Sequence, residues 1–403
     1  MVNNFKIDSK LIFIIITMFL NFLGFSILFP VLPFMVGKYV SNPHQIAIYV
    51  GFLASSFAFF QFVAAPGLGV LSDKYGRKPV LLICLFGSII GYLILGFANT
   101  LWMLFAGRII DGITGGNNTI MYAYMADITK PEERSRYFGL LGASAGAGMI
   151  LGPVIGGFFG AIRLSLPLFI AAFIAFANLI FGFFVLKESL SSHLKTTHFK
   201  LYHLNPFRPL SHVLNTKILK EIFITGFFFY IGLFGIYSTN VVFLSDVFKW
   251  TSSSIGLLLF FVGFVVVFSQ GYLVHKLHNK LDETKVAMLG LLLAVIGFFI
   301  ASITSFYTST ILICFAIITL NIGNGLFDPS QSGLISKSVG PSVQGKIQGA
   351  NQAMQAITRI IGPLFATYIF RFWTGLPYFA SGLLTLISLM VLIFFVKPMF
   401  QKK

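Results

Sequence analysis

Apolar segments about twenty residues long follow one another along almost the whole chain, and this pattern constrains the fold more than any other feature. A helix of that length crosses the hydrocarbon core of a bilayer, where backbone polar groups must be satisfied within the segment. Only 10% of the 403 residues are charged and 57% are hydrophobic, whereas soluble domains carry about 25% charged residues. The composition therefore excludes a soluble enzyme, a nucleic-acid-binding domain and a disordered chain.

Breaks at charges, prolines and polar turns divide the chain into twelve predicted spans. They cover residues 11–36, 46–71, 78–98, 101–126, 136–161, 165–187, 220–245, 253–275, 284–305, 308–335, 345–370 and 375–397. The longest connection is rich in lysine and separates six spans from six. We therefore predict an all-α integral membrane protein with an N-terminal half (1–187), a basic cytoplasmic linker (188–219) and a C-terminal half (220–403).

The distribution of lysine and arginine orients the predicted spans. Cytoplasmic loops of membrane proteins carry an excess of these residues. With the N-terminus in the cytoplasm, the outer loops receive only Lys38, Arg163, Lys249 and Arg371, and a miscounted span would scramble this division. We expect a multi-pass protein of the bacterial cytoplasmic membrane, with both termini cytoplasmic. It should contact the lipid bilayer, act as a monomer and bind no nucleic acid.

The two halves resemble each other when one is shifted by 210 residues. Glycines and prolines then coincide at Gly115 and Gly325, Pro131 and Pro341, Gly139 and Gly349, and Gly152-Pro153 and Gly362-Pro363. Chance sharing of glycine and proline between membrane helices is a poor explanation for so many matches at one offset. Parallel six-helix repeats are typical of one transporter architecture, with the substrate site between the repeats.

The most specific local pattern lies between the second and third predicted spans, and reads Gly67-Leu-Gly69-Val-Leu-Ser72-Asp73-Lys74-Tyr-Gly76-Arg77-Lys78. Its glycines permit a tight reversal, and Asp73 can face a helix N-terminus, where the dipole favours an anion. A merely basic loop would not explain the lone aspartate. The pattern strongly resembles the inner-loop signature of the major facilitator superfamily, which implies a gating role for Gly69, Asp73, Lys74, Gly76, Arg77 and Lys78.

The same resemblance implies that Asp127 pairs with Arg77 as a latch of the inner gate. The second copy of the loop departs from the signature, because His275 stands in place of Asp73 and Asn279 in place of Arg77. We therefore expect the latch of the C-terminal half to be degraded.

The fourth predicted span contains Arg108 and Asp111, which lie three residues apart on one helix face, followed by Asn117 and Asn118. Charges within a membrane span are expensive and by default mark a functional site. A neutral structural ion pair is the alternative. We favour Asp111 as the proton-coupling carboxylate because it lies near the predicted middle of the span, with Asp328 as the weaker candidate.

The fifth predicted span repeats glycine every fourth residue, which exposes a backbone stripe for close helix packing. The run from Gly148 through Gly152, Pro153, Gly156 and Gly157 also resembles the antiporter signature of drug-exporting members. The first span resembles that of tetracycline-type exporters. It departs from them at Asn21, which cannot titrate where many of them carry an aspartate.

Polar side chains in the C-terminal half complete the predicted substrate cavity. The cavity set comprises Asn21, Arg108, Asn117, Asn118, Tyr237, Asn321, Asn324, Gln352, Gln355 and Arg359. An arginine that snorkels to the membrane interface, or a tyrosine at that interface, is the alternative for Arg359 and Tyr237. Two arginines balance two aspartates inside the spans, so we expect an anionic, zwitterionic or neutral polar substrate.

Neither a metal nor a cofactor is predicted. The linker histidines lack the acids or cysteines that usually complete a metal site, and a basic loop near anionic headgroups accounts for them better; they are His193, His198, His203 and His212. The resemblance implies a secondary active transporter that works by alternating access and exports a drug or metabolite in exchange for protons. A proton-coupled importer of a nutrient or siderophore is the alternative, and an enzyme is not expected.

Overall fold

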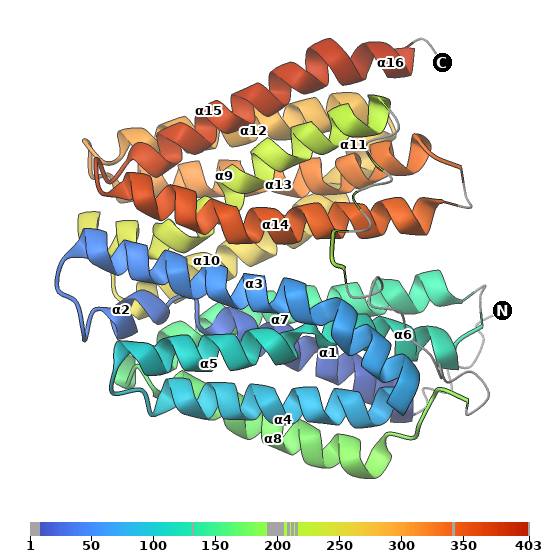
Figure 1. Cartoon of the computed structure of the whole chain (residues 1–403). Coiled ribbons are helices and arrows are strands. Elements are labelled where there is room, and N and C mark those ends of the chain that lie inside the picture. Colours follow the sequence, from blue (N-terminus) through green and yellow to red (C-terminus); the bar gives the residue numbers. More distant parts are fainter. Residues whose placement is uncertain are drawn as a thin grey trace. The chain divides into compact units, whose positions relative to one another are not determined.

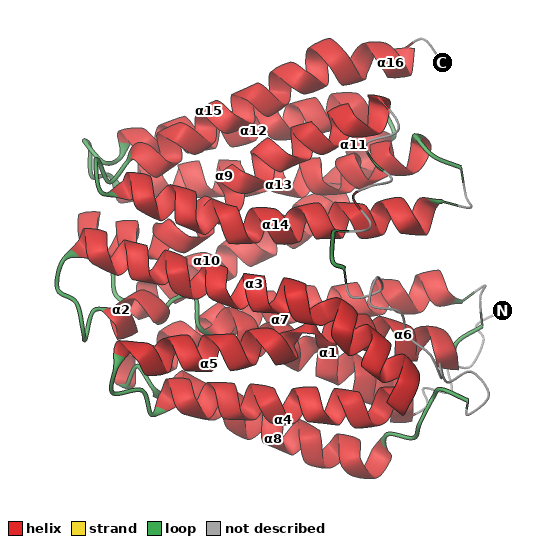
Figure 2. Cartoon of the chain, in the orientation of Figure 1, coloured by secondary structure: helices red, strands yellow, loops and turns green. Residues whose placement is uncertain are grey.

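The computed structural model describes residues 9–130, 133–191, 205–207, 210, 213, 217–340 and 343–401. Within these ranges every regular element is a helix, as the apolar segments predict (Figure 2). Contacts divide the chain into two compact units, Met1–Val31 with Phe59–Pro206 and Leu32–Ala58 with Phe207–Lys403. The linker histidines His193, His198, His203 and His212 lie outside the described residues.

The first unit is built from helices of the N-terminal part of the chain (Figure 1). They are α1 (Ser9–Ile27), α4 (Arg77–Gly96), α5 (Leu101–Thr114), the 3-10 turn η1 (Gly115–Asn117), α6 (Asn118–Ile128), α7 (Arg134–Ile162) and α8 (Leu166–Val185). The helix α3 (Pro43–Tyr75) is shared, since its residues from Phe59 onward belong to this unit.

The second unit contains the start of α3 and the remaining helices. They are α2 (Leu32–Val36), α9 (Lys217–Val247), α10 (Ser252–Phe268), the π-helical turn η5 (Ser269–Leu273), α11 (Val274–His278), α12 (Glu283–Ile303), α13 (Thr310–Lys337), α14 (Gln344–Phe370), α15 (Leu376–Val391), the π-helical turn η6 (Leu392–Val396) and α16 (Lys397–Gln401).

Residues 32–58 lie with the second unit, although the spans placed them in the N-terminal half. Small residues of α3 explain this position. The Ser55 hydroxyl donates a hydrogen bond to the Ile360 carbonyl at 2.7 Å, and Gly51 lies directly against the Thr367 side chain, which leaves no room for a Cβ. The boundary between two six-helix halves stays a prediction.

Eleven helices among the described residues are long and apolar enough to cross a membrane. The predicted span 101–126 is not among them, because α5 ends at Thr114 and η1 separates it from α6. The predicted span 11–36 is also interrupted, since α1 ends at Ile27 and α2 begins at Leu32. Gly116 of η1 packs against Ala65 of α3, where a Cβ would be crowded. The sequence Gly-Gly-Asn-Asn therefore breaks the helix where α3 approaches closely.

Helix boundaries reproduce the offset of the internal repeat. Both α7 and α14 begin just after Pro131 and Pro341, at Arg134 and Gln344, and α8 and α15 begin at Leu166 and Leu376. The same packing recurs as well: Gly91 of α4 meets α5, as Gly297 of α12 meets α13.

The glycine stripe of α7 packs against α1, as predicted. A Cβ added at Gly148, Gly152 or Gly156 would collide with the backbone of α1 or with Ser26. The Ser26 hydroxyl also donates to the Gly148 carbonyl at 3.0 Å. Pro153 and Gly157 of the same run are buried. Close packing accounts for this run, and an antiport role for it stays a prediction.

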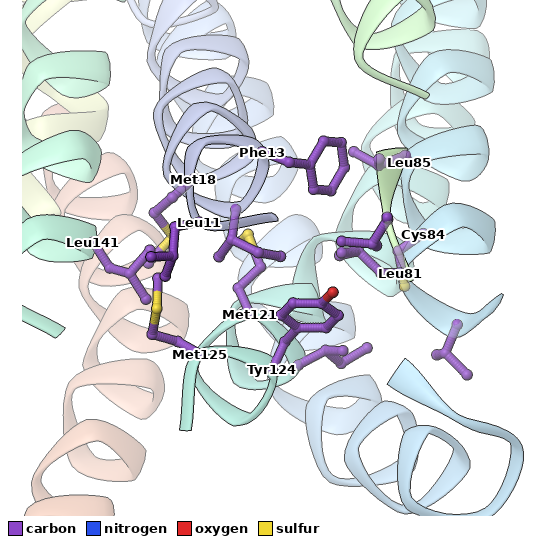
Figure 3. Close-up of a cluster of buried hydrophobic side chains, with 14 residues drawn as sticks. Leu11, Phe13, Met18, Leu81, Cys84, Leu85, Met121, Tyr124, Met125 and Leu141 are labelled. Atoms are coloured by element: carbon purple, nitrogen blue, oxygen red, sulfur yellow. The ribbon is translucent and has the colours of Figure 1, made fainter. Parts of the chain in front are cut away.

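A cluster of buried apolar side chains joins α1, α4, α6 and α7 at one end of the first unit (Figure 3). Phe13, Leu81 and Tyr124 are fully enclosed there. Lipid tails are as apolar as these side chains, so close packing and dispersion hold the cluster together rather than exclusion of water. The cluster fixes α4 against α6 next to the loop signature.

Candidate functional site

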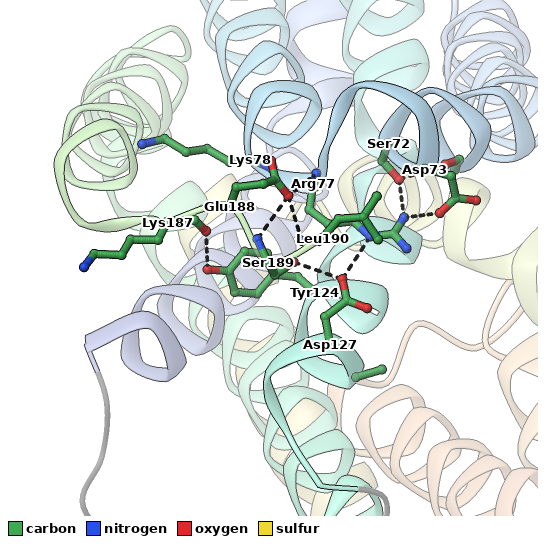
Figure 4. A network of polar contacts seen from close by, with 12 residues as sticks. Ser72, Asp73, Arg77, Lys78, Tyr124, Asp127, Lys187, Glu188, Ser189 and Leu190 are labelled. Carbon is green, nitrogen blue, oxygen red and sulfur yellow. Dashed lines mark hydrogen bonds and ion pairs between the residues drawn. The ribbon is translucent and has the colours of Figure 1, made fainter. Parts of the chain in front are cut away.

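Arg77, the first residue of α4, is the centre of a polar network that we call the loop network: Ser72, Asp73, Arg77, Asp127, Glu188 and Ser189 (Figure 4). Its guanidinium Nη1 lies 2.5 Å from Asp73 Oδ1 and donates to the Ser72 hydroxyl at 2.7 Å. Its Nε donates to Asp127 Oδ2 at 3.2 Å. Arg77 is only 9% exposed, so the ion pair with Asp127 implied by the resemblance is present and largely shielded.

The sequence did not single out Ser72, Glu188 or Ser189 of this network, and Glu188 is the charged residue among them. Its carboxylate accepts hydrogen bonds from the backbone N–H groups of Arg77 at 2.8 Å and Lys78 at 3.2 Å. Such an acceptor satisfies donors that a helix N-terminus leaves free and places negative charge at the positive end of the dipole. The chain has only 12 acidic residues among 403, so an acid directly after a predicted span was the feature of the sequence that pointed to Glu188.

The position of Glu188 corrects the expectation for Asp73. Asp73 lies in the last turns of α3 and pairs with Arg77, whereas Glu188 occupies the N-terminus of α4. Gly76 between them has φ of 110°, a conformation that favours glycine, and a Cβ there would collide with the Glu188 carboxylate.

The segment 187–190 is fastened to the network from several sides. Ser189 donates to Asp127 Oδ2 at 2.9 Å, and Tyr124 donates to the Lys187 carbonyl at 2.7 Å. Lys78 Nζ donates to the Phe183 carbonyl at 2.9 Å. Of the other predicted gating residues, Lys74 is exposed and lies over the Tyr75 ring, and Gly69 accepts a hydrogen bond from Ser72.

A first polar cluster joins α1 to the break before α6. The Asn21 amide nitrogen donates to the side-chain oxygens of Asn117 at 3.0 Å and Asn118 at 2.9 Å. Asn117 is completely buried and Asn118 is partly exposed. Gln61 of α3 donates to the Gly115 carbonyl at 2.9 Å, next to the same break. The predicted cavity residues Asn21, Asn117 and Asn118 are therefore brought together by hydrogen bonds between their side-chain amides.

Arg108 and Asp111 form an enclosed ion pair on α5, with Nη1 to Oδ2 at 3.4 Å. The two residues are 4% and 3% exposed. Gly91 of α4 packs directly on Asp111. Both charges of this pair lie inside the unit, where a ligand has little access to them.

A second polar cluster, the Asp328 cluster, lies between α9, α13 and α14. The Tyr230 hydroxyl donates to Asp328 Oδ1 at 2.5 Å, and the Gln355 amide donates to the same oxygen at 3.4 Å. The Arg359 guanidinium stacks on the Phe234 ring at 5.0 Å. Asp328 is partly exposed and Arg359 is exposed, so this cluster carries accessible charge of both signs.

The remaining predicted cavity residues in this unit lie in different surroundings. Tyr237 is 40% exposed and lies 3.5 Å from the Asn321 oxygen. Asn321 and Asn324 are buried, while Gln352 is exposed on the helix that carries Gln355 and Arg359.

Long apolar helices, polar clusters within them and an ion-paired loop network define a membrane transporter rather than an enzyme. The chain belongs to the major facilitator superfamily, because the model of that family matches residues 14–363. The class C tetracycline resistance protein of Escherichia coli is 33% identical to it over 95% of this chain and 96% of the relative. The class H tetracycline resistance protein of Pasteurella multocida is also 33% identical, over 94% of each chain.

Solved structures agree with the fold. The crystal structure of the human organic anion transporter MFSD10 covers 95% of this chain and 99% of its own, with a TM-score of 0.69 and 22% identity. The expected major facilitator fold is thereby confirmed.

Proposed function

We propose that this protein exports tetracycline-class antibiotics across the bacterial cytoplasmic membrane in exchange for protons. The observation that carries the proposal is the similarity to two tetracycline resistance proteins along nearly the whole length of each chain. The loop network, with its Arg77–Asp127 ion pair, supports the same assignment. These two relatives favour export over the alternative, a proton-coupled importer of a nutrient or siderophore.

Asp328 is the coupling carboxylate that the geometry favours. A proton carrier must meet water on at least one side of the membrane, and Asp328 is partly exposed. Tyr230 and Gln355 donate hydrogen bonds to one carboxylate oxygen, which leaves the other available for a proton. The charged and titratable groups around it are Tyr230 and Tyr237 on α9 and Arg359 on α14.

This choice reverses the order expected from the sequence, which favoured Asp111. Asp111 is almost fully enclosed and already paired with Arg108. Separating a buried ion pair leaves an uncompensated charge, and removing one partner of such a pair costs about 3–5 kcal/mol. We therefore assign Arg108 and Asp111 a structural role.

The substrate face that we propose lies on α14 and α9, where Gln352, Arg359 and Tyr237 are exposed within predicted spans. Polar groups at membrane depth are tolerated where they line a water-filled cavity. A face with an arginine, an amide and a phenol suits a zwitterionic, hydroxyl-rich ligand. Tetracyclines fit this description, since they combine a dimethylammonium group with ionisable enols.

We further propose that the loop network lies at the cytoplasmic side, that both termini are cytoplasmic and that the transporter works as a monomer. The excess of lysine and arginine in the corresponding loops supports the orientation. In this arrangement the network holds the ends of α3, α4 and α6 together and biases the balance between access states.

Transport in everted membrane vesicles tests the proposal. An imposed proton gradient should drive uptake of tetracycline into vesicles that contain the protein, and substrate addition should release protons. Asp328→Asn should abolish gradient-driven uptake while exchange of labelled for unlabelled tetracycline continues. Full gradient-driven uptake by Asp328→Asn would remove Asp328 as the coupling group, and no uptake by the wild type would remove tetracycline as substrate.

A further inference from the structure

In each unit an ion pair joins the start of one helix to the end of a neighbouring helix, and the charges are exchanged between the two units. In the first unit, Arg77 opens α4 and pairs with Asp127 near the end of α6, at 3.2 Å. In the second unit, Glu283 opens α12 and pairs with Lys337, the last residue of α13, at 2.6 Å. Lys337 follows Asp127 by the 210 residues of the repeat.

Helix dipoles distinguish the two pairs. Negative charge is favoured at a helix N-terminus and positive charge at a C-terminus. Glu283 and Lys337 follow this preference, whereas Arg77 and Asp127 oppose it. The first unit compensates with the distant Glu188 carboxylate at the start of α4. In the second unit the preceding residue, Asp282, caps α12 itself by accepting from the Lys285 N–H at 2.8 Å.

Stability alone is a weak explanation for the second pair. The side chains of Lys337 and Glu283 are 59% and 23% exposed, and ion pairs this open to solvent contribute little to the free energy of folding. Only 10% of the residues are charged, so opposite charges seldom meet at helix ends in both units by chance. The residues that form the pair differ in both members, Arg77 and Asp127 in one unit and Glu283 and Lys337 in the other. The two pairs share only the electrostatic attraction between two helix ends.

We propose that Glu283 and Lys337 form a second latch, of reversed polarity, that the transport cycle requires. The pair fastens the start of α12 to the end of α13, as Arg77–Asp127 fastens α4 to α6. Glu283 and Lys337 are positioning residues: they keep this end of the helix pair closed while the access state changes. This pair lies outside the loop pattern of His275 and Asn279, whose expected degradation stays a prediction.

Charge exchange tests the pair directly. Glu283→Lys and Lys337→Glu should each lower the initial rate of tetracycline uptake about five- to tenfold per folded transporter, with the equilibrium dissociation constant for tetracycline unchanged within about twofold. The double variant Glu283→Lys/Lys337→Glu has the polarity of the first unit and should recover to within about threefold of the wild type. Lys280→Glu, at an exposed lysine of the neighbouring loop, is the matched control and should transport normally.

A second measurement tests the latch without relying on tetracycline as the substrate. The latch rests on the proposed function only because it requires a transporter that changes between access states. A cysteine at Ser332, on α13 before Lys337, is labelled with a membrane-impermeant maleimide in everted vesicles. Labelling should be faster in each single variant and return to the wild-type rate in the double variant, whatever the cargo. The latch is overturned if the labelling rate of the single variants equals that of the wild type. It is also overturned if the double variant is labelled as fast as the faster single variant.

Discussion

The Glu188 carboxylate accepts a hydrogen bond from the backbone N–H of Arg77 at 2.8 Å, across 111 positions of sequence. The same carboxylate also accepts from Ser189 and Leu190, so it orders its own segment while it caps α4. The position of Arg77, and with it the contacts to Asp73 and Asp127, therefore depends on an acid at the end of another span.

Removing this cap should loosen the start of α4. Glu188→Ala is expected to lower the free energy of unfolding by about 1 kcal/mol, as for other lost helix caps, and to slow transport. Glu188→Gln keeps an acceptor oxygen and should retain most of the stability. Thermal unfolding in detergent and vesicle uptake measure both effects. Glu133→Ala removes an exposed acid elsewhere in the unit and serves as the control; an equal effect of both alanine variants would refute the capping role.

Asp73 should affect the rate of the cycle and leave substrate binding intact. It pairs with Arg77, is half-exposed and belongs to the loop network rather than to either polar cluster. Asp73→Asn is therefore expected to lower the uptake rate several-fold while the dissociation constant for tetracycline stays within about threefold. Initial rates and equilibrium binding on the same preparation decide this. Normal transport at normal expression would show that Asp73 has no part in gating.

The buried pair on α5 should behave as a structural unit. Arg108→Met leaves Asp111 as an unpaired charge in an enclosed site, so we expect a loss of about 3–5 kcal/mol and little folded protein. The double variant Arg108→Met/Asp111→Leu removes both charges and should restore folding. Yield of monodisperse protein in detergent and the unfolding temperature report this. A double variant that folds but fails only in proton-driven uptake would instead assign coupling to Asp111.

The glycine stripe gives a prediction with a control on the same helix. Gly152→Val places methyl groups against Ser26 and the backbone of α1, so α1 and α7 must separate and the amount of folded protein should fall strongly. Gly139→Val meets no atom within 4 Å of the added Cβ and should cost about 0.5 kcal/mol or less. Fluorescence-detected size exclusion compares the two. Similar yields would mean that the stripe does not determine the packing.

Much of this protein is determined by its sequence alone. Apolar segments of bilayer length predict an all-helical membrane protein, because a backbone in lipid has few ways to satisfy its polar groups. The offset between Gly152-Pro153 and Gly362-Pro363 reveals the repeat, and the loop pattern around Asp73 and Arg77 indicates the family. These features are local or periodic, so they can be read without knowing which helices meet.

Only the tertiary structure decides which helix ends come together. It brings Glu188 to the start of α4, moves the start of α3 into the second unit and interrupts the span at Gly115–Asn117. It also pairs Glu283 with Lys337, an ion pair that the loop pattern of His275 and Asn279 did not predict. These features depend on contacts between positions far apart in sequence. The energy of such a contact depends on the distance between the two groups and on their burial, and both are set by how the helices pack.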